Sequence, residues 1–172
     1  MGERFEAMLT GGHPNSLGRT VEVVDLILDD RAMLNELYQC YFSKDEVVRL
    51  RVSSAFKRVT TAHPDWTMDH MDGLLSEIAA IDQASTQWTL AILFDLTQDL
   101  LSSQQTSRAL EIMKLNLANH DDWIVLNTTM NVLADWSKSD VELQAFMVPH
   151  LQRLANDPRK SVSKKAQKLL GS

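Results

Sequence analysis

The sequence predicts an all-α fold of stacked helical hairpins, and three observations support that prediction. Only six of the 172 residues are Gly and four are Pro, the residues that interrupt helices. Apolar residues recur with helical spacing along most of the chain. A short pattern also recurs. An Asp or a polar cluster comes first, a lead apolar residue follows, and further residues, mostly apolar, stand four and eight positions after the lead residue. The lead positions lie 40, 37 and 37 residues apart, as expected for two-helix repeats: Val48, Trp88, Val125 and Val162.

Turn and capping residues delimit the predicted helices in the first half of the chain. Gly and Pro in residues 11–14 end the first helix, because both interrupt regular helical backbone. Ser43 and Glu46 have the S-x-x-E spacing of a capping box, which predicts a helix start at this point. The predicted helices here cover residues 3–9, 17–28, 30–41, 45–60 and 67–81.

Capping residues also delimit the predicted helices in the second half of the chain. Ser139 and Glu142 form a second possible capping box, and Asp157 precedes a proline at a first helical position, where the missing amide costs nothing. The predicted helices cover residues 84–101, 105–118, 122–136, 140–155 and 159–170. Paired along the chain, these helices predict one domain over residues 1–172 with four to five hairpins, at about 3–29, 31–60, 67–101, 105–136 and 140–170.

Composition and charge restrict the classes of function. The net charge of −6 argues against binding of nucleic acid, and no run approaches the ~20 apolar residues of a membrane helix. A single cysteine, Cys40, and the lack of a signal-peptide pattern at the N-terminus predict a cytoplasmic protein. The charge is uneven, because residues 61–150 carry three basic and thirteen acidic groups, whereas residues 151–172 carry six and one.

The recurring pattern resembles the HEAT repeat, a family with an Asp near the turn between its two helices. In that family a Val follows the Asp, often with Arg after it, and apolar residues stand at +4 and +8. The best match here comprises Asp45, Val48, Arg49, Val52 and Phe56. The middle copies depart from the pattern, since Trp88 replaces the usual Val, and Thr89 and Leu126 replace the usual Arg. Over residues 31–170 the resemblance implies an α-α superhelix, a right-handed solenoid whose second helices line the concave side.

Few residues suggest catalysis or metal binding. Cys40 lies within a predicted helix without a cationic neighbour in sequence, so we expect a small packed residue and not a nucleophile. His63, Asp69 and His70 are weak candidates for a metal site, because His and carboxylates ligate zinc. The i, i+4 His spacing of a helical metal motif is missing, and Asp at a proline turn usually caps a helix. The sequence therefore predicts no catalytic group, metal or other cofactor.

The surface of the second helices is the predicted interaction site. Positions one and five residues after each lead residue lie beside the core face, polar at both ends of the array and apolar in its middle. An apolar centre with a polar rim is typical of a site for a protein partner. The alternative is that these central helices are buried by their neighbours. The candidate binding residues are Arg49, Ser53, Lys57, Leu93, Leu126, Met130, Lys164, Gln167 and Lys168.

The leading hypothesis is therefore a non-enzymatic scaffold that binds an unidentified protein, with self-association through the same patch as a further possibility. Two alternatives follow from the family resemblance. One is a lyase-type or accessory HEAT-like protein that binds a small ligand such as a tetrapyrrole. The other is a relative of HEAT-like DNA glycosylases, which use Trp, Asp and Arg in a basic groove, whereas the middle of this chain is acidic.

Overall fold

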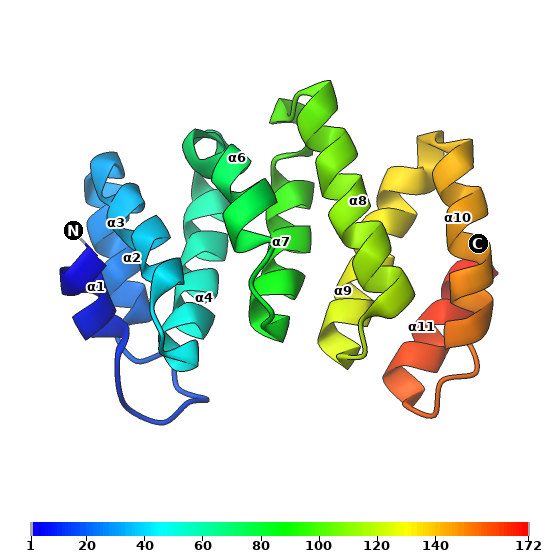
Figure 1. Ribbon diagram of the computed structural model, residues 1–172, viewed down its shortest axis with the longest axis horizontal. Coiled ribbons are helices and arrows are strands. Elements are labelled where there is room, and N and C mark those ends of the chain that lie inside the picture. The colour runs from blue at the N-terminus through cyan, green and yellow to red at the C-terminus, as the bar shows by residue number, and fades with distance from the viewer. Residues whose placement is uncertain (1, 172) are drawn as a thin grey trace.

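The computed structural model describes residues 2–171, with side chains from Arg4 onward, and this part of the chain is helical and contains no strand (Figure 1). The all-α prediction is confirmed. The longer helices are α1 (Gly2–Leu9), α2 (Thr20–Asp29), α4 (Glu46–Ala62), α7 (Ala84–Leu96), α8 (Ser103–Asn119), α9 (Trp123–Trp136), α10 (Val141–Leu154) and α11 (Lys160–Leu170). The shorter ones are α3 (Leu34–Gln39), α5 (Pro64–Thr67) and α6 (Met71–Gly73).

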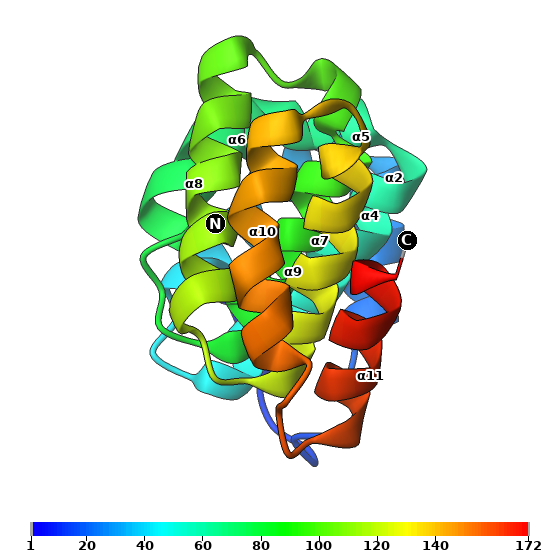
Figure 2. The same ribbon diagram turned by 90° about the vertical axis from the view of Figure 1, so that its right-hand side faces the viewer.

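The helices lie in two layers, because each helix buries its apolar stripe against its neighbours. Helices α2, α4, α7, α9 and α11 pack side by side in chain order and form what we call the second-helix layer. The intervening helices α1, α3, α6, α8 and α10 form the first-helix layer, and the short helix α5 lies against α4 where the chain passes between the layers (Figure 2). Figure 2, which looks from the C-terminal end, shows the two layers side by side. The face of the second-helix layer that points away from the other layer is therefore uncovered.

The helix starts differ in detail from the predicted capping boxes. The cap of α4 is Asp45, whose carboxylate accepts from the Val47 amide, while Ser43 accepts from the Asp45 amide and donates to Glu6. The cap of α10 is Asp140 and not Ser139. In both cases the helix begins later than expected, and the aspartate directly before it accepts from a first-turn amide, Val47 in α4 and Leu143 in α10. The capping box that does form joins Ser102 and Gln105 at the start of α8.

The helix starts also correct one of the predicted lead positions. The residues that immediately precede α4, α7, α9 and α11 are Asp45, Gln83, Asp122 and Arg159. The residues three positions later are buried in every case: Val48, Thr86, Val125 and Val162, which lie 38, 39 and 37 residues apart. The choice of Trp88 as a lead position was wrong, and Trp88 is only half-buried. The reason is that a polar threonine fills the core position of α7.

The first-helix layer is irregular between Pro64 and Ile78. Two short helices, α5 and α6, are joined through a 3-10 turn and followed by one π-helical turn at Leu74–Ile78, so the predicted single helix 67–81 does not form. Gly73 lies where the Tyr38 ring approaches the backbone. A Cβ atom on Gly73 would be 1.9 Å from Tyr38 Oη and 2.8 Å from Cζ. The ring has little room to retreat, because it stacks on His70 with 4.8 Å between centroids.

We expect Gly73→Ala to lower the free energy of unfolding by about 2 kcal/mol, because the added methyl group overpacks a buried ring. Urea denaturation followed by circular dichroism measures the loss. In a Tyr38→Leu background the same substitution should cost less than half as much. An equal cost in both backgrounds would show that Tyr38 is not the obstacle.

Several arginines join segments that lie far apart along the chain. Arg108 of α8 donates to the Leu75 carbonyl at 3.0 Å, and Arg153 of α10 donates to the Leu117 carbonyl at 3.1 Å. Arg159, at the start of α11, donates to the Asp121 carbonyl and forms a two-oxygen pair with the carboxylate of Asp157. These contacts satisfy carbonyls that helix ends and turns leave without an internal partner.

Arg51 is the most buried member of this set, with 1% of its surface exposed. Its guanidinium donates to the carbonyls of Leu9, Gly11, His13 and Ser16, and so fixes the loop between α1 and α2. That loop turns at Gly11, Gly12 and Gly18, which have positive φ angles. A Cβ on Gly18 would stand 3.1 Å from the Arg51 guanidinium carbon, so glycine gives both the backbone conformation and the space.

Candidate protein-interaction surface

Four of the predicted binding residues are buried and cannot contact a partner in this fold. Leu93 and Met130 are 0% exposed, and Ser53 and Leu126 are 1% exposed. Ser53 Oγ is 2.9 Å from Tyr41 Oη, so its polar group is used inside the molecule. The prediction of an apolar groove at these positions was wrong. On α4 and α9 a step of one residue past the lead position, about 100°, turns the side chain toward a neighbouring helix and not toward solvent. Leu93 lies seven residues past Thr86 and therefore belongs to the core stripe of α7 itself.

Arg49 is half-buried and holds two neighbouring hairpins together. Its Nε donates to Gln83 Oε1 at 2.7 Å, and a terminal nitrogen donates to the Ser43 carbonyl at 2.7 Å. Gln83 in turn donates to the Glu46 carbonyl at 2.9 Å. The arginine that the resemblance placed after the lead residue is therefore engaged in the packing of α4 against the start of α7.

The other predicted residues lie at the surface. Lys57 on α4 and Lys164, Gln167 and Lys168 on α11 are exposed. Gln167 Nε2 donates to the Ala155 carbonyl at 3.0 Å, which joins α11 to the end of α10. Lys57 and Lys164 form no ion pair with any residue between 2 and 171. These two cations can meet an external carboxylate.

The uncovered face of the second-helix layer lies two and six residues past each lead position, because two residues turn a helix by about 200°. These side chains are all half-buried or exposed. From α4 to α11 the pairs are Leu50 and Ser54, Trp88 and Ile92, Asn127 and Asn131, and Lys164 and Lys168. We call this set the free face. It is apolar on α4 and α7, carries amides on α9 and is basic on α11.

The weak metal candidates do not assemble a site. His63 stacks on Trp66 with 4.0 Å between centroids, and Asp69 pairs with Arg31 at 2.8 Å. His70 stacks on Tyr38, and burial lowers the pKa of its imidazole. Among the described residues no group of three His, Cys, Asp or Glu side chains could hold a metal ion. Ring stacking and ion pairing explain these residues.

Cys40 is not activated as a nucleophile. It is 1% exposed, and its thiol donates to the Glu36 carbonyl at 3.3 Å. Burial first, and then the carboxylates of Glu6 and Glu36, raise the pKa of the thiol to about 12. Because the thiolate is the reactive form, this thiol is suited to packing.

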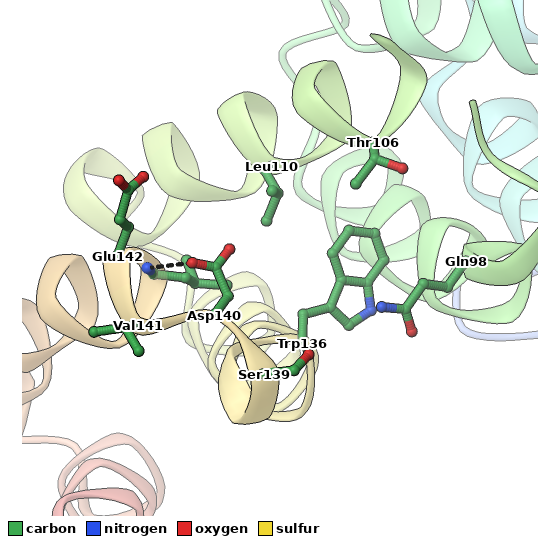
Figure 3. A pocket seen from close by; sticks show the side chains of 9 residues that line it. Gln98, Thr106, Leu110, Trp136, Ser139, Asp140, Val141 and Glu142 are labelled. Carbon is green, nitrogen blue, oxygen red and sulfur yellow. Dashed lines mark hydrogen bonds between the residues drawn. The ribbon is translucent and has the colours of Figure 1, made fainter. Parts of the chain in front are cut away.

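An open pocket of about 360 Å³ lies between the first half of α8, the end of α9 and the start of α10, with Gln98 from the turn after α7 (Figure 3). The Trp136 ring forms its wall, and its Nε1 donates to Asp95 Oδ1 at 3.0 Å. Asp140 accepts from the Leu143 amide at 3.0 Å, so that carboxylate caps α10. The polar groups at this pocket serve the fold, and its lining residues include no pair of nucleophile and base.

No family model, curated protein or solved structure matches this chain. None of the helices within residues 2–171 is both long enough and apolar enough to cross a membrane. The geometry of the free face is therefore the main guide to function.

Proposed function

We propose that this chain is a non-enzymatic protein-interaction module of the HEAT-like type, a right-handed α-solenoid of five hairpins that acts in the cytoplasm. The equivalent burial of Val48, Thr86, Val125 and Val162 and the side-by-side order of the helices support the solenoid. The proposed repeats pair α1 with α2, α3 with α4, the segment Pro64–Ile78 with α7, α8 with α9, and α10 with α11.

The observation that carries the proposal is the apolar part of the free face. Leu50 lies on α4, and Trp88 and Ile92 lie on the adjacent helix α7; all three are half-buried, and none belongs to the partly buried apolar residues that pack against the core. Adjacent packed helices lie about 8–10 Å apart, so these side chains form a continuous strip. Tryptophan at the centre of such a strip is the residue most often found to dominate binding at protein interfaces.

Unpaired lysines elsewhere on the second-helix layer indicate the chemistry of the partner. Lys57 lies on α4 and Lys164 on α11, and neither cation is paired within the described chain. We therefore propose a partner segment that covers Leu50, Trp88 and Ile92 with apolar side chains and places carboxylates toward the lysines. Complementary charge at a rim mainly fixes orientation and speeds association.

Site-specific photo-cross-linking tests this proposal. With p-benzoylphenylalanine at Ser54, on the free face, we expect a discrete cross-linked protein from the source cell that Trp88→Ala reduces by about tenfold. Trp123→Ala is the matched control, because Trp123 is 49% exposed at the start of α9 and outside the free face. Circular dichroism should show that both variants remain folded.

A second probe position makes the result specific. Ser107 is exposed on α8 in the first-helix layer, so a probe there should not capture the same protein. Identical adducts from Ser54 and Ser107, or adducts at Ser54 that persist in Trp88→Ala, would contradict the use of this face.

A further inference from the structure

The pocket of about 360 Å³ that Trp136 borders is lined by two acidic side chains and by no basic one. We call it the Trp136 pocket. Figure 3 shows Leu110 of α8 on one side of it and Asp140 and Glu142, from the start of α10, on the other. It opens between two successive hairpins, and none of its lining residues belongs to the free face. An acidic pocket within the array is thus a second candidate site.

The two carboxylates of this pocket have no cation of their own. Neither Asp140 nor Glu142 forms an ion pair with a described residue. Asp140 uses Oδ1 to accept from the Leu143 amide at 3.0 Å, which leaves its second oxygen for another donor. The start of a helix carries only about half a positive charge, so two carboxylates keep the pocket negative.

The basic side chains on the neighbouring turns are engaged elsewhere and do not neutralise the pocket. Arg108 on α8 pairs with Glu111 at 3.3 Å, and Lys138 pairs with Asp135 at 2.9 Å. The ammonium group of Lys114 stands over an aromatic ring of α10. A positive group from outside the molecule is therefore the complement that the pocket lacks.

The apolar part of the lining selects the kind of cation. The guanidinium group is planar and weakly hydrated, packs well against aromatic rings and carries five N–H donors, whereas an ammonium group is compact and strongly hydrated. Among aromatic rings, the indole attracts a cation most strongly, and Trp136 forms a wall of the pocket. Val141 at the rim is 78% exposed, so the methylene stem of an arginine can lie against an apolar surface there.

We propose that the Trp136 pocket binds an arginine side chain of a partner protein. The guanidinium group packs against the Trp136 ring and donates to the carboxylates of Asp140 and Glu142. The stem of the arginine lies between Leu110 and Val141. Because this pocket is separate from the free face, its test neither requires the proposed function nor decides it.

An NMR titration of the full chain tests the proposal, with a blocked pentapeptide that has arginine between glycines as the probe. At constant ionic strength, the Trp136 indole N–H and the backbone amides of Val141 and Glu142 should shift in a saturable way, with a Kd on the order of 1 mM. The same peptide with citrulline, a neutral isostere of arginine, should not bind. The lysine peptide should bind at least about threefold more weakly. Trp136→Phe identifies the indole resonance, which it removes.

A pair of double variants tests the carboxylates. Asp140→Asn with Glu142→Gln removes both charges and should weaken binding of the arginine peptide at least about tenfold. Asparagine caps a helix as well as aspartate does, so α10 should keep its start. The matched control is Asp45→Asn with Glu46→Gln, which makes the same change at the cap and first turn of α4, outside the pocket, and should leave the affinity unchanged. Circular dichroism should show that both proteins remain folded.

Three results would overturn the proposal. They are the absence of saturable shifts, equal binding by the citrulline or lysine peptide, and an unchanged affinity in the variant without the pocket carboxylates. Free arginine separates a protein segment from a small molecule as the ligand, and it should bind no more tightly than the peptide. Binding of free arginine without binding of the peptide would contradict a protein partner.

Discussion

Replacement of Arg51 by alanine is expected to lower the free energy of unfolding by about 3 kcal/mol. The substitution removes a guanidinium that is 1% exposed and leaves four carbonyl groups, from Leu9 to Ser16, without their donor. Buried polar groups that lose their partner cost far more than an average hydrogen bond contributes. Chemical denaturation measures the loss, and hydrogen exchange should show faster exchange of amides in the α1–α2 loop.

Two comparisons separate the geometry of Arg51 from its charge. Arg51→Lys keeps the charge but cannot reach several carbonyls at once, so it should recover only a minor part of the loss. Arg58→Ala removes an exposed arginine from the same helix and should change stability little. If Arg51→Ala and Arg58→Ala are equally stable, Arg51 does not hold the loop.

Replacement of Trp136 by alanine should have the largest effect of any single change, about 4 kcal/mol. Trp136 is 6% exposed, fills the space between α7, α8 and α9, and donates to Asp95 at 3.0 Å. Its removal opens a large cavity and leaves that carboxylate without its donor. Thermal and urea denaturation should both show the loss.

Trp136→Phe separates packing from the hydrogen bond, because it keeps a ring and removes the N–H. We expect it to cost about 1–2 kcal/mol. Trp123→Ala is the matched control for loss of a tryptophan, and it should cost less than 1 kcal/mol, since Trp123 is 49% exposed. A Trp136→Ala protein as stable as Trp123→Ala would contradict the packing role.

Helices were predictable from the sequence, whereas their exact starts and the register of one repeat were not. Periodicity identified α4, α8, α9 and α11 to within a few residues because each has a clear apolar stripe and a polar break before it. The prediction of the register of α7 failed because Thr86 occupies the core position of this helix, while Trp88 and Ile92 are half-buried on its other side. When the apolar side chains of a helix are divided between core and surface, hydrophobicity alone does not identify which of them face the core.

The same ambiguity explains the errors in the predicted site. Leu93, Leu126 and Met130 are apolar side chains beside a core stripe, and sequence alone does not show whether a neighbouring helix covers them. Lys57, Lys164 and Lys168 were correctly placed at the surface, since long charged side chains rarely become buried without a partner. Counting from the helix caps, and not from the apolar residues, would have placed the half-buried residues Leu50 and Trp88 outside the core stripe.

The direction of the arginine contacts gives the stack an inherent polarity. Arg51, Arg108, Arg153 and Arg159 all reach back to carbonyls of the preceding hairpin. Deletion of α10 and α11 therefore leaves acceptors without donors, chiefly the carbonyls of Leu117 and Asp121 and the side-chain oxygen of Asn131. Arg49 is the exception to this direction, because it donates forward to Gln83. Deletion from the N-terminal side instead removes the acceptors of a guanidinium group. In the case of Arg51 that cation is buried. Shortened versions of this protein should consequently tolerate loss of their last hairpin far better than loss of their first.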